Sequence, residues 1–126
     1  MHQQKGAKKQ SYFSRSAVLS ALERVAILAN ERTNVIKLSF LKGAKTVKLS
    51  SNSPDYGNAL DEVDVDYEGN DLEIAFNYKY LSEALRNLKV ENLMLELDNS
   101  LSPLLLKLNE EVDYDYTYLV MPVQLR

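Results

Sequence analysis

The chain has 126 residues, of which 45% are hydrophobic and 26% charged, and its formal net charge is −3. These values predict a single globular domain with enough chain to bury a core, and no apolar stretch approaches the roughly 20 residues of a membrane-spanning helix. The absence of cysteine excludes disulfides, thiolate nucleophiles and cysteine-based metal sites, and it fits a reducing cytoplasm.

The first residues are basic, whereas the rest of the chain is acidic. Residues 1–16 carry a net charge of +4 and contain no acid, so residues 17–126 carry −7. An acidic body argues against a protein that binds nucleic acid by phosphate neutralisation alone, but it allows one small basic face. We interpret residues 1–13 as a flexible basic leader and expect the folded domain to span residues 14–126.

Two stretches have the periodicity of amphipathic helices. The first begins at Ser16, a good N-cap residue, and the second has Asn77 as its N-cap. The residues expected on the apolar faces are Val18, Leu19, Leu22, Val25, Ala26 and Ala29 in the first helix, and Tyr78, Leu81, Leu85 and Leu88 in the second. Ile27 projects onto the polar side of the first helix, beside Leu28. A lone exposed isoleucine usually has no role, but this pair also fits a contact surface.

The remaining periodic stretches alternate as β-strands do. They are 33–40 and 45–51, which form a hairpin around Gly43, then 61–69, 72–76, 93–98, 103–108 and 114–123. The order helix, four strands, helix, three strands predicts an α+β fold, in which two helices pack on one side of antiparallel sheets. The half that begins near Ser14 has the same layout as the half that begins near Phe76.

Candidates for catalysis or metal binding are few. His2 is the only histidine, and it lies in the expected leader. A row of acids, Glu62, Asp64, Asp66 and Glu68, lies on one face of a strand, where charge more often protects a sheet edge. We therefore expect no enzyme activity, no metal and no cofactor.

The last strand is apolar on both faces. Tyr118 and Val120 point one way, whereas Leu119, Met121 and Val123 point the other. Such a strand is either buried on both sides or lines a groove, in which methionine and aliphatic side chains adapt to a peptide. The pattern alone favours an ordinary core strand.

Four separated motifs carry a family resemblance. They are "ALERVAILANE", "LEIAFNYKYLSEAL", "LDNSLSPLLL" and "YLVMPVQLR". Together they resemble the C-terminal domain of the bacterial DNA polymerase III beta subunit, the sliding clamp, and the last is most similar to cyanobacterial members. The resemblance covers residues 14–126 in collinear order. It implies a sliding-clamp fold, with two helices facing DNA and sheets outside.

The family resemblance also implies a function. Members are non-enzymatic processivity factors of three similar domains, and two subunits join head to tail into a cytoplasmic ring around duplex DNA. The ring binds DNA without reading its sequence, and it docks polymerase III subunits and other proteins that carry short clamp-binding motifs. This chain has one domain where the family has three, and the preceding domain supplies the other half of the peptide groove.

Particular residues match the family's functional positions. The resemblance places at the peptide groove Asn77, Tyr80, Leu101, Pro103, Leu119, Val120, Met121, Pro122, Val123 and Gln124. It places Ile27 and Leu28 at the subunit interface and Arg24 toward DNA. Gln124 departs from the arginine of many members. Two alternatives stay open: a truncated or split clamp fragment without independent activity, and an unrelated small peptide-binding domain.

Overall fold

The computed structural model describes residues 9–27, 34–53 and 57–124 as ten strands and two helices. In chain order these are β1 (Lys9–Ser14), α1 (Arg15–Ala26), β2 (Val35–Phe40), β3 (Thr46–Ser53), β4 (Gly57–Asp64), β5 (Asp66–Glu68), β6 (Leu72–Asn77), α2 (Tyr78–Asn87), β7 (Asn92–Leu97), β8 (Leu104–Leu108), β9 (Thr117–Val120) and β10 (Pro122–Val123). Neither described helix is long and apolar enough to cross a membrane.

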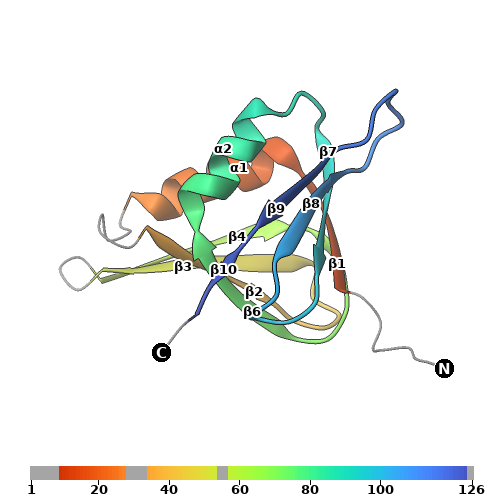
Figure 1. Ribbon diagram of the computed structural model, residues 1–126. Coiled ribbons are helices and arrows are strands. Elements are labelled where there is room, and N and C mark those ends of the chain that lie inside the picture. Colours follow the sequence, from red (N-terminus) through yellow and green to blue (C-terminus); the bar gives the residue numbers. More distant parts are fainter. Residues whose placement is uncertain (1–8, 28–33, 54–56, 125–126) are drawn as a thin grey trace.

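The strands form two antiparallel five-stranded sheets. The first sheet has the order β5-β1-β7-β8-β9, and the second has the order β10-β6-β2-β3-β4. The two helices lie side by side along the same side of the molecule (Figure 1). This arrangement confirms the predicted α+β fold with both helices on one side of the sheets.

The two halves of the domain have the same topology. Each half runs strand, helix, and then four strands, with β1 to β5 in the first and β6 to β10 in the second. Replacing each strand of the first half by its counterpart in the second converts one sheet order into the other. In each half, the first and last strands lie in the same sheet, whereas the three strands between them lie in the other sheet. Each sheet therefore contains strands from both halves, and neither half can form a complete sheet alone.

A single hydrophobic core fills the space between the sheets and the helices. Strand alternation supplies most of it, because every second side chain points inward. In β2 the inward residues are Ile36, Leu38 and Phe40, and all three are buried. The helices add Leu22 and Leu85, which are fully buried, as the predicted apolar faces require. Ala21 was not among the predicted core residues, yet it is also fully buried and belongs to the core.

The expected leader is wrong in its last residues. Residues 9–13 belong to β1, which lies between β5 and β7 inside the first sheet. Ser11 and Phe13 alternate inward and are buried. The strand was missed because its partners are distant in sequence; Phe13, for example, pairs with Leu93. Residues 1–8 of the expected leader lie outside the described residues.

Three expected element boundaries also move. Helix α1 begins at Arg15 with Ser14 at its N-cap, not with Ser16. The stretch 61–69 was expected to be one strand, but it divides into β4 in the second sheet and β5 in the first. The stretch 114–123 divides in the same way into β9 and β10. In both cases the alternation continues across the crossing, so the sequence pattern does not show where the strand changes sheet.

Candidate functional site

Met121 lies where the chain crosses from the first sheet to the second. It follows β9 and precedes β10, and its side chain is 60% exposed. Leu104 pairs with Val120 on one side of the crossing, and Phe76 pairs with Pro122 on the other. Met121 therefore lies between the Val120–Leu104 pair at the start of β8 and the Pro122–Phe76 pair near the end of β6. Figure 1 shows the chain passing from β9 to β10 at this point.

Asn77 and Tyr80 approach this position from the start of α2. The Asn77 side chain accepts the backbone N–H of Lys79 at 2.9 Å, which caps the helix as predicted. Asn77 is the residue after Phe76, the β6 partner of Pro122. The first turn of α2 then presents Tyr80, which is 56% exposed. A hollow of about 460 Å³ over α2 is lined in part by Tyr80 and Arg86.

Leu101 and Pro103 come from the turn before β8. The Asn99 side chain accepts the backbone N–H of Leu101 at 2.8 Å and the hydroxyl of Ser102 at 3.1 Å. Asparagine favours such turns because its side chain bonds the backbone two residues on. The turn holds Leu101 outward with 62% of its surface exposed. Pro103 directly precedes Leu104, the partner of Val120, and so lies beside the crossing.

The end of the chain supplies the remaining predicted groove residues. Leu119 is 53% exposed, Pro122 and Val123 are half-buried, and Gln124 is exposed. Pro122 lacks a backbone N–H and therefore suits β10, an edge strand of its sheet. Val120 departs from the expectation. It is only 2% exposed, so its side chain belongs to the core and does not line the surface.

Leu105 is a residue of this surface that the sequence reasoning missed. It pairs with Leu119 across β8 and β9 and is half-buried, whereas Leu104 and Leu106 beside it are buried. The run of three leucines was the available signal. In a strand with one exposed face, alternation predicts a polar residue at the middle position, and an apolar Leu105 there indicates a contact surface. The docking surface is defined here as Tyr80, Leu101, Pro103, Leu105, Leu119 and Met121, with Asn77 at its border.

Ile27, which is predicted to lie at the subunit interface, is near the β3–β4 edge of the second sheet, opposite the edge formed by β10. Ile27 is 79% exposed at the end of α1, as expected from its position off the core face. The Ser51 hydroxyl of β3 donates to the carbonyl of Val25 at 2.9 Å, which places this helix end beside the hairpin of β3 and β4. Strand β4 is an edge of its sheet. Leu28 lies outside the described residues.

Arg24, predicted to face DNA, already has a partner. Its Nε lies 2.5 Å from the Asp61 carboxylate, and its side chain remains 59% exposed. The hydrogen bond from Arg24 holds the pKa of the Asp61 carboxyl below its usual range. A similar ion pair joins Arg86 of α2 to Glu23 of α1 at 2.9 Å. Arg24 and Arg86 therefore each have a carboxylate partner in the folded domain.

The acidic row contains no assembled metal site. In the described part of the chain, no group of three or more histidine, cysteine or carboxylate side chains could hold a metal ion. Glu62, Asp64, Asp66 and Glu68 are all exposed, and Glu62 accepts the hydroxyl of Thr46 at 3.1 Å. The row follows β4 and β5, which are edge strands. Its position fits the interpretation as a charged edge.

Comparison with known proteins identifies the family. The family model "DNA polymerase III beta subunit, C-terminal domain" matches residues 5–124. The chain belongs to this family. The match also includes β1, which agrees with the position of that strand inside the first sheet.

Relatives of this clamp domain include beta sliding clamps from distant bacteria. The chain is 38% identical over 112 residues to the protein from Synechococcus elongatus, which covers 89% of the chain and 29% of that protein. It is 39% identical over 121 residues to the protein from Pseudomonas putida, covering 96% of the chain and 32% of that protein. The chain thus spans about a third of the length of these curated relatives. The cyanobacterial match agrees with the predicted resemblance.

Solved structures confirm the clamp fold. The DNA polymerase III beta subunit of Pseudomonas aeruginosa superposes with a TM-score of 0.84 at 34% identity, over 98% of this chain and 32% of that one. The beta subunit of Thermotoga maritima gives 0.86 at 32% identity, over the same shares. A Pseudomonas aeruginosa clamp bound to griselimycin also gives 0.86 at 32% identity, over 98% of this chain and 32% of that one.

Proposed function

We propose that this domain acts as part of a DNA polymerase processivity clamp and docks the short apolar motifs of replication and repair proteins. The partners are DNA polymerase III subunits and other proteins with such motifs, and the ligand site is the docking surface around Met121. The role is non-catalytic and cytoplasmic. It consists of holding partner proteins on a ring that encloses duplex DNA.

The exposed apolar side chains of the docking surface carry this proposal. Leu101, Leu119 and Met121 are each more than half exposed, although a folded domain gains about 25 cal/mol for each Å² of apolar surface that it removes from water. They come from two separate parts of the chain, which are brought together by the pairing of Leu104 with Val120, the residue between Leu119 and Met121. Contiguous apolar surface of this kind is typical of a binding site. Asn77 adds an amide at its border that can hydrogen-bond a peptide backbone.

The position of Ile27 supports a second contact, with the neighbouring subunit of the ring. Its exposed side chain follows Arg24, which pairs with Asp61 of β4, and among the described residues the outer edge of β4 has no partner strand. An open edge can accept a strand from another chain, while an apolar side chain next to it supplies buried area. In this proposal Ile27 and Leu28 pack against the first domain of the next subunit, head to tail.

A peptide titration tests the docking role. A fluorescent peptide that carries a glutamine-leucine-phenylalanine clamp motif is added to the wild-type domain and to the variants Met121→Ala and Tyr80→Ala. We expect weak but saturable binding, because this chain supplies only part of a groove, and a loss of about tenfold in each variant. The control is Leu41→Ala, which removes a leucine that is 48% exposed in the turn between β2 and β3. Failure of the wild-type domain to bind at millimolar peptide would contradict the proposal.

A ring-assembly experiment separates this role from that of a fragment without independent activity. The domain is mixed with a separate protein that contains the two missing clamp domains, and retention on closed circular DNA is measured before and after linearisation. A ring is retained on the circle and slides off the linear form. We expect retention to fall in Ile27→Asp, because a carboxylate at an apolar contact has no partner there. No retention in any combination would favour the inactive fragment.

A further inference from the structure

The second sheet has an outer face that the core does not use. In β2, Ile36 and Leu38 point inward and are buried, so the alternate residues Val35 and Lys37 point outward. In β4 the alternation turns Leu60 to this outer face, where it is 64% exposed. Leu60 makes no contribution to the hydrophobic core. A leucine so exposed within a regular strand suggests a role in binding and not in core packing.

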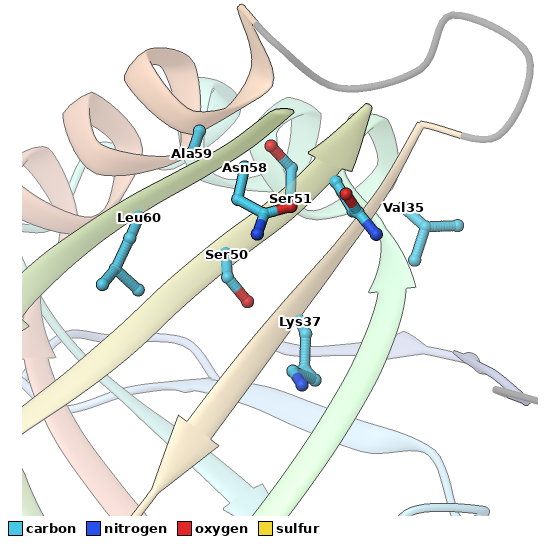
Figure 2. A pocket seen from close by; sticks show the side chains of 8 residues that line it. Val35, Lys37, Ser50, Ser51, Asn58, Ala59 and Leu60 are labelled. Carbon is cyan, nitrogen blue, oxygen red and sulfur yellow. The ribbon is translucent and has the colours of Figure 1, made fainter. Parts of the chain in front are cut away.

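Leu60 lies in a hollow of about 430 Å³ on this face (Figure 2). The residues around it are Val35, Lys37, Ser50, Ser51, Asn52, Asn58, Ala59 and Leu60, from three adjacent strands. Lys37 pairs with Ser50, which pairs with Leu60, so these three lie in one row across the sheet. The hollow thus combines an apolar wall with hydroxyl, amide and ammonium groups.

The hollow is continuous with the docking surface. Val35, at one end of the hollow, pairs directly with Asn77, the border residue of that surface. Met121 directly precedes β10, and four strand spacings of about 4.8 Å separate β10 from the strand of Leu60, or about 19 Å in all. An extended peptide advances about 3.3 Å per residue, so about seven residues are more than enough to span this distance. A polypeptide seated at Met121 therefore reaches Leu60 with a short flanking segment.

We infer that this hollow is a second subsite for the polypeptide that docks at Met121, and that it takes a flanking segment with an aliphatic side chain and a carboxylate. The inference rests on the proposed function. The aliphatic side chain packs on Leu60 and Val35, and the carboxylate binds Lys37. Asn58, which is exposed, hydrogen-bonds the backbone of the segment.

The charge on Lys37 is accessible to such a carboxylate. Its Nζ lies 3.6 Å from the Glu73 carboxylate, and both side chains are more than a third exposed. Exposed pairs at this distance contribute little to stability, because solvent screens them. An incoming carboxylate can therefore share Lys37 with Glu73 without disrupting the fold. This subsite favours acidic flanks, and it discriminates partners that carry the same core motif.

The test compares short and extended peptides on the wild-type domain. The short fluorescent peptide contains only the glutamine-leucine-phenylalanine motif. Two extended peptides add seven residues, including one leucine and one aspartate, either before or after the motif. We expect one extended peptide to bind about fivefold more tightly than the short one, which corresponds to about 40 Å² of additional apolar burial. We also expect the backbone NMR signals of Ser50 and Leu60 to shift only with that peptide.

Variants then separate the two subsites. Leu60→Ser and Lys37→Gln should each remove the gain of the extended peptide and leave the short peptide unchanged, whereas Met121→Ala should weaken both. Leu41→Ser is the matched control and should change neither. If the short peptide binds but neither extension adds affinity, or if the gain survives both Leu60→Ser and Lys37→Gln, the second subsite is overturned and the proposed function stands. If the wild-type domain binds no peptide, the proposed function fails and this inference fails with it.

Discussion

The carboxylate of Glu91 accepts the backbone N–H of Ser16 at 3.0 Å, so a residue that precedes β7 caps the start of α1. The same carboxylate accepts the hydroxyls of Ser14 and Ser16, each at 2.5 Å. The backbone N–H of Arg15 also donates to the Glu91 carbonyl at 2.7 Å. Helix α2 is capped locally by Asn77, whereas α1 depends on this contact from the other half of the domain. Glu91 thereby links the two topological halves.

Replacement of this acid should destabilise the domain. Glu91→Gln keeps the shape of the side chain but removes the charge that the α1 N-terminus and two hydroxyls stabilise. We expect the free energy of unfolding at pH 7 to fall by about 1 kcal/mol, as for the loss of a helix cap, since partial solvent exposure limits the effect. Urea unfolding followed by circular dichroism measures it. The control is Glu111→Gln, at an exposed position, which should change the free energy by less than about 0.5 kcal/mol.

The loss of stability caused by Glu91→Gln should depend on pH. The bonds from Ser14 and Ser16 lower the pKa of the Glu91 carboxyl from 4.5 to about 2. A carboxyl whose pKa is lower in the folded state stabilises the protein above its unfolded pKa, and this contribution disappears as the pH falls through the folded pKa. The difference between wild type and Glu91→Gln should therefore be constant above about pH 5.5 and shrink between pH 4.5 and pH 2. A difference that stays constant down to pH 2 would contradict the assigned role of the charge.

Two buried serines should respond in opposite ways to the same substitution. Ser11 in β1 is 1% exposed, and its hydroxyl has no hydrogen-bond partner among the described residues. Ser51 in β3 is 5% exposed, but its hydroxyl donates to the Val25 carbonyl. Since an unpaired buried hydroxyl costs about 1–3 kcal/mol, Ser11→Ala should raise the free energy of unfolding by about 1 kcal/mol. Ser51→Ala should lower it by a similar amount. Thermal and urea unfolding of both variants test this prediction, and a fall in both would refute it.

Two glycines provide another matched pair. Gly69 has a φ of +148°, and a methyl group added there would lie 2.7 Å from Lys9 Cγ and 2.9 Å from the Tyr67 hydroxyl. Gly43 in the β2–β3 turn has a φ of +80° and open space around it. We expect Gly43→Ala to cost about 1 kcal/mol from backbone strain alone, and Gly69→Ala to cost at least about 2 kcal/mol because steric overlap adds to the strain. Equal losses in urea unfolding would show that the contacts with β1 contribute nothing.

The elements that the sequence predicts correctly are those set by local signals. Helix α2 shows its cap in Asn77 and its apolar stripe at i, i+3 and i+4 spacing, and the β2–β3 hairpin shows its turn in Gly43. The exposure of Ile27 followed from the same helical geometry. Each of these features depends on residues within about ten positions of one another, so no knowledge of the tertiary structure was needed.

The features that the sequence misses depend on distant residues. Strand β1 does not stand out because the polar Ser11 occupies one of its inward positions, and its pairing with β7 joins segments about 80 positions apart. The cap that Glu91 provides for α1 spans a similar distance. The sheet crossings at Val65 and Met121 are also invisible in the alternation. The backbone N–H of Val65 still donates to the Lys45 carbonyl at 2.9 Å, in continuation of the β3–β4 register, whereas the next residue, Asp66, pairs with Tyr12 in the first sheet. In the candidate site, Met121 was identified by resemblance, whereas the sheet crossing explains its exposure.

Neighbouring residues at the sheet crossing should separate folding from binding. Val120 is 2% exposed and Met121 is 60% exposed. Val120→Ala should lower the free energy of unfolding by about 1–2 kcal/mol through the loss of buried methyl groups, whereas Met121→Ala should change it by less than about 0.5 kcal/mol. In the peptide titration, Met121→Ala should weaken binding and Val120→Ala should leave it nearly unchanged, because only Met121 presents its side chain to a ligand. A large loss of stability in Met121→Ala would show that this residue belongs to the core.

Release of Arg24 from Asp61 should strengthen DNA binding. In the folded domain the Asp61 carboxylate neutralises the guanidinium, although most of the Arg24 side chain faces solvent. Asp61→Asn removes the negative charge and frees Arg24 for a phosphate contact. We expect a severalfold gain in affinity for a 20-base-pair duplex at 50 mM salt, and a steeper loss with added salt by about one counterion, with no dependence on base sequence. Fluorescence anisotropy over a salt series measures both quantities.

Glu62→Gln, which changes the net charge equally at the adjacent position, is the control. If it raises the affinity as much as Asp61→Asn, net charge and not Arg24 is responsible. The double variant Asp61→Asn, Arg24→Gln should lose the gain.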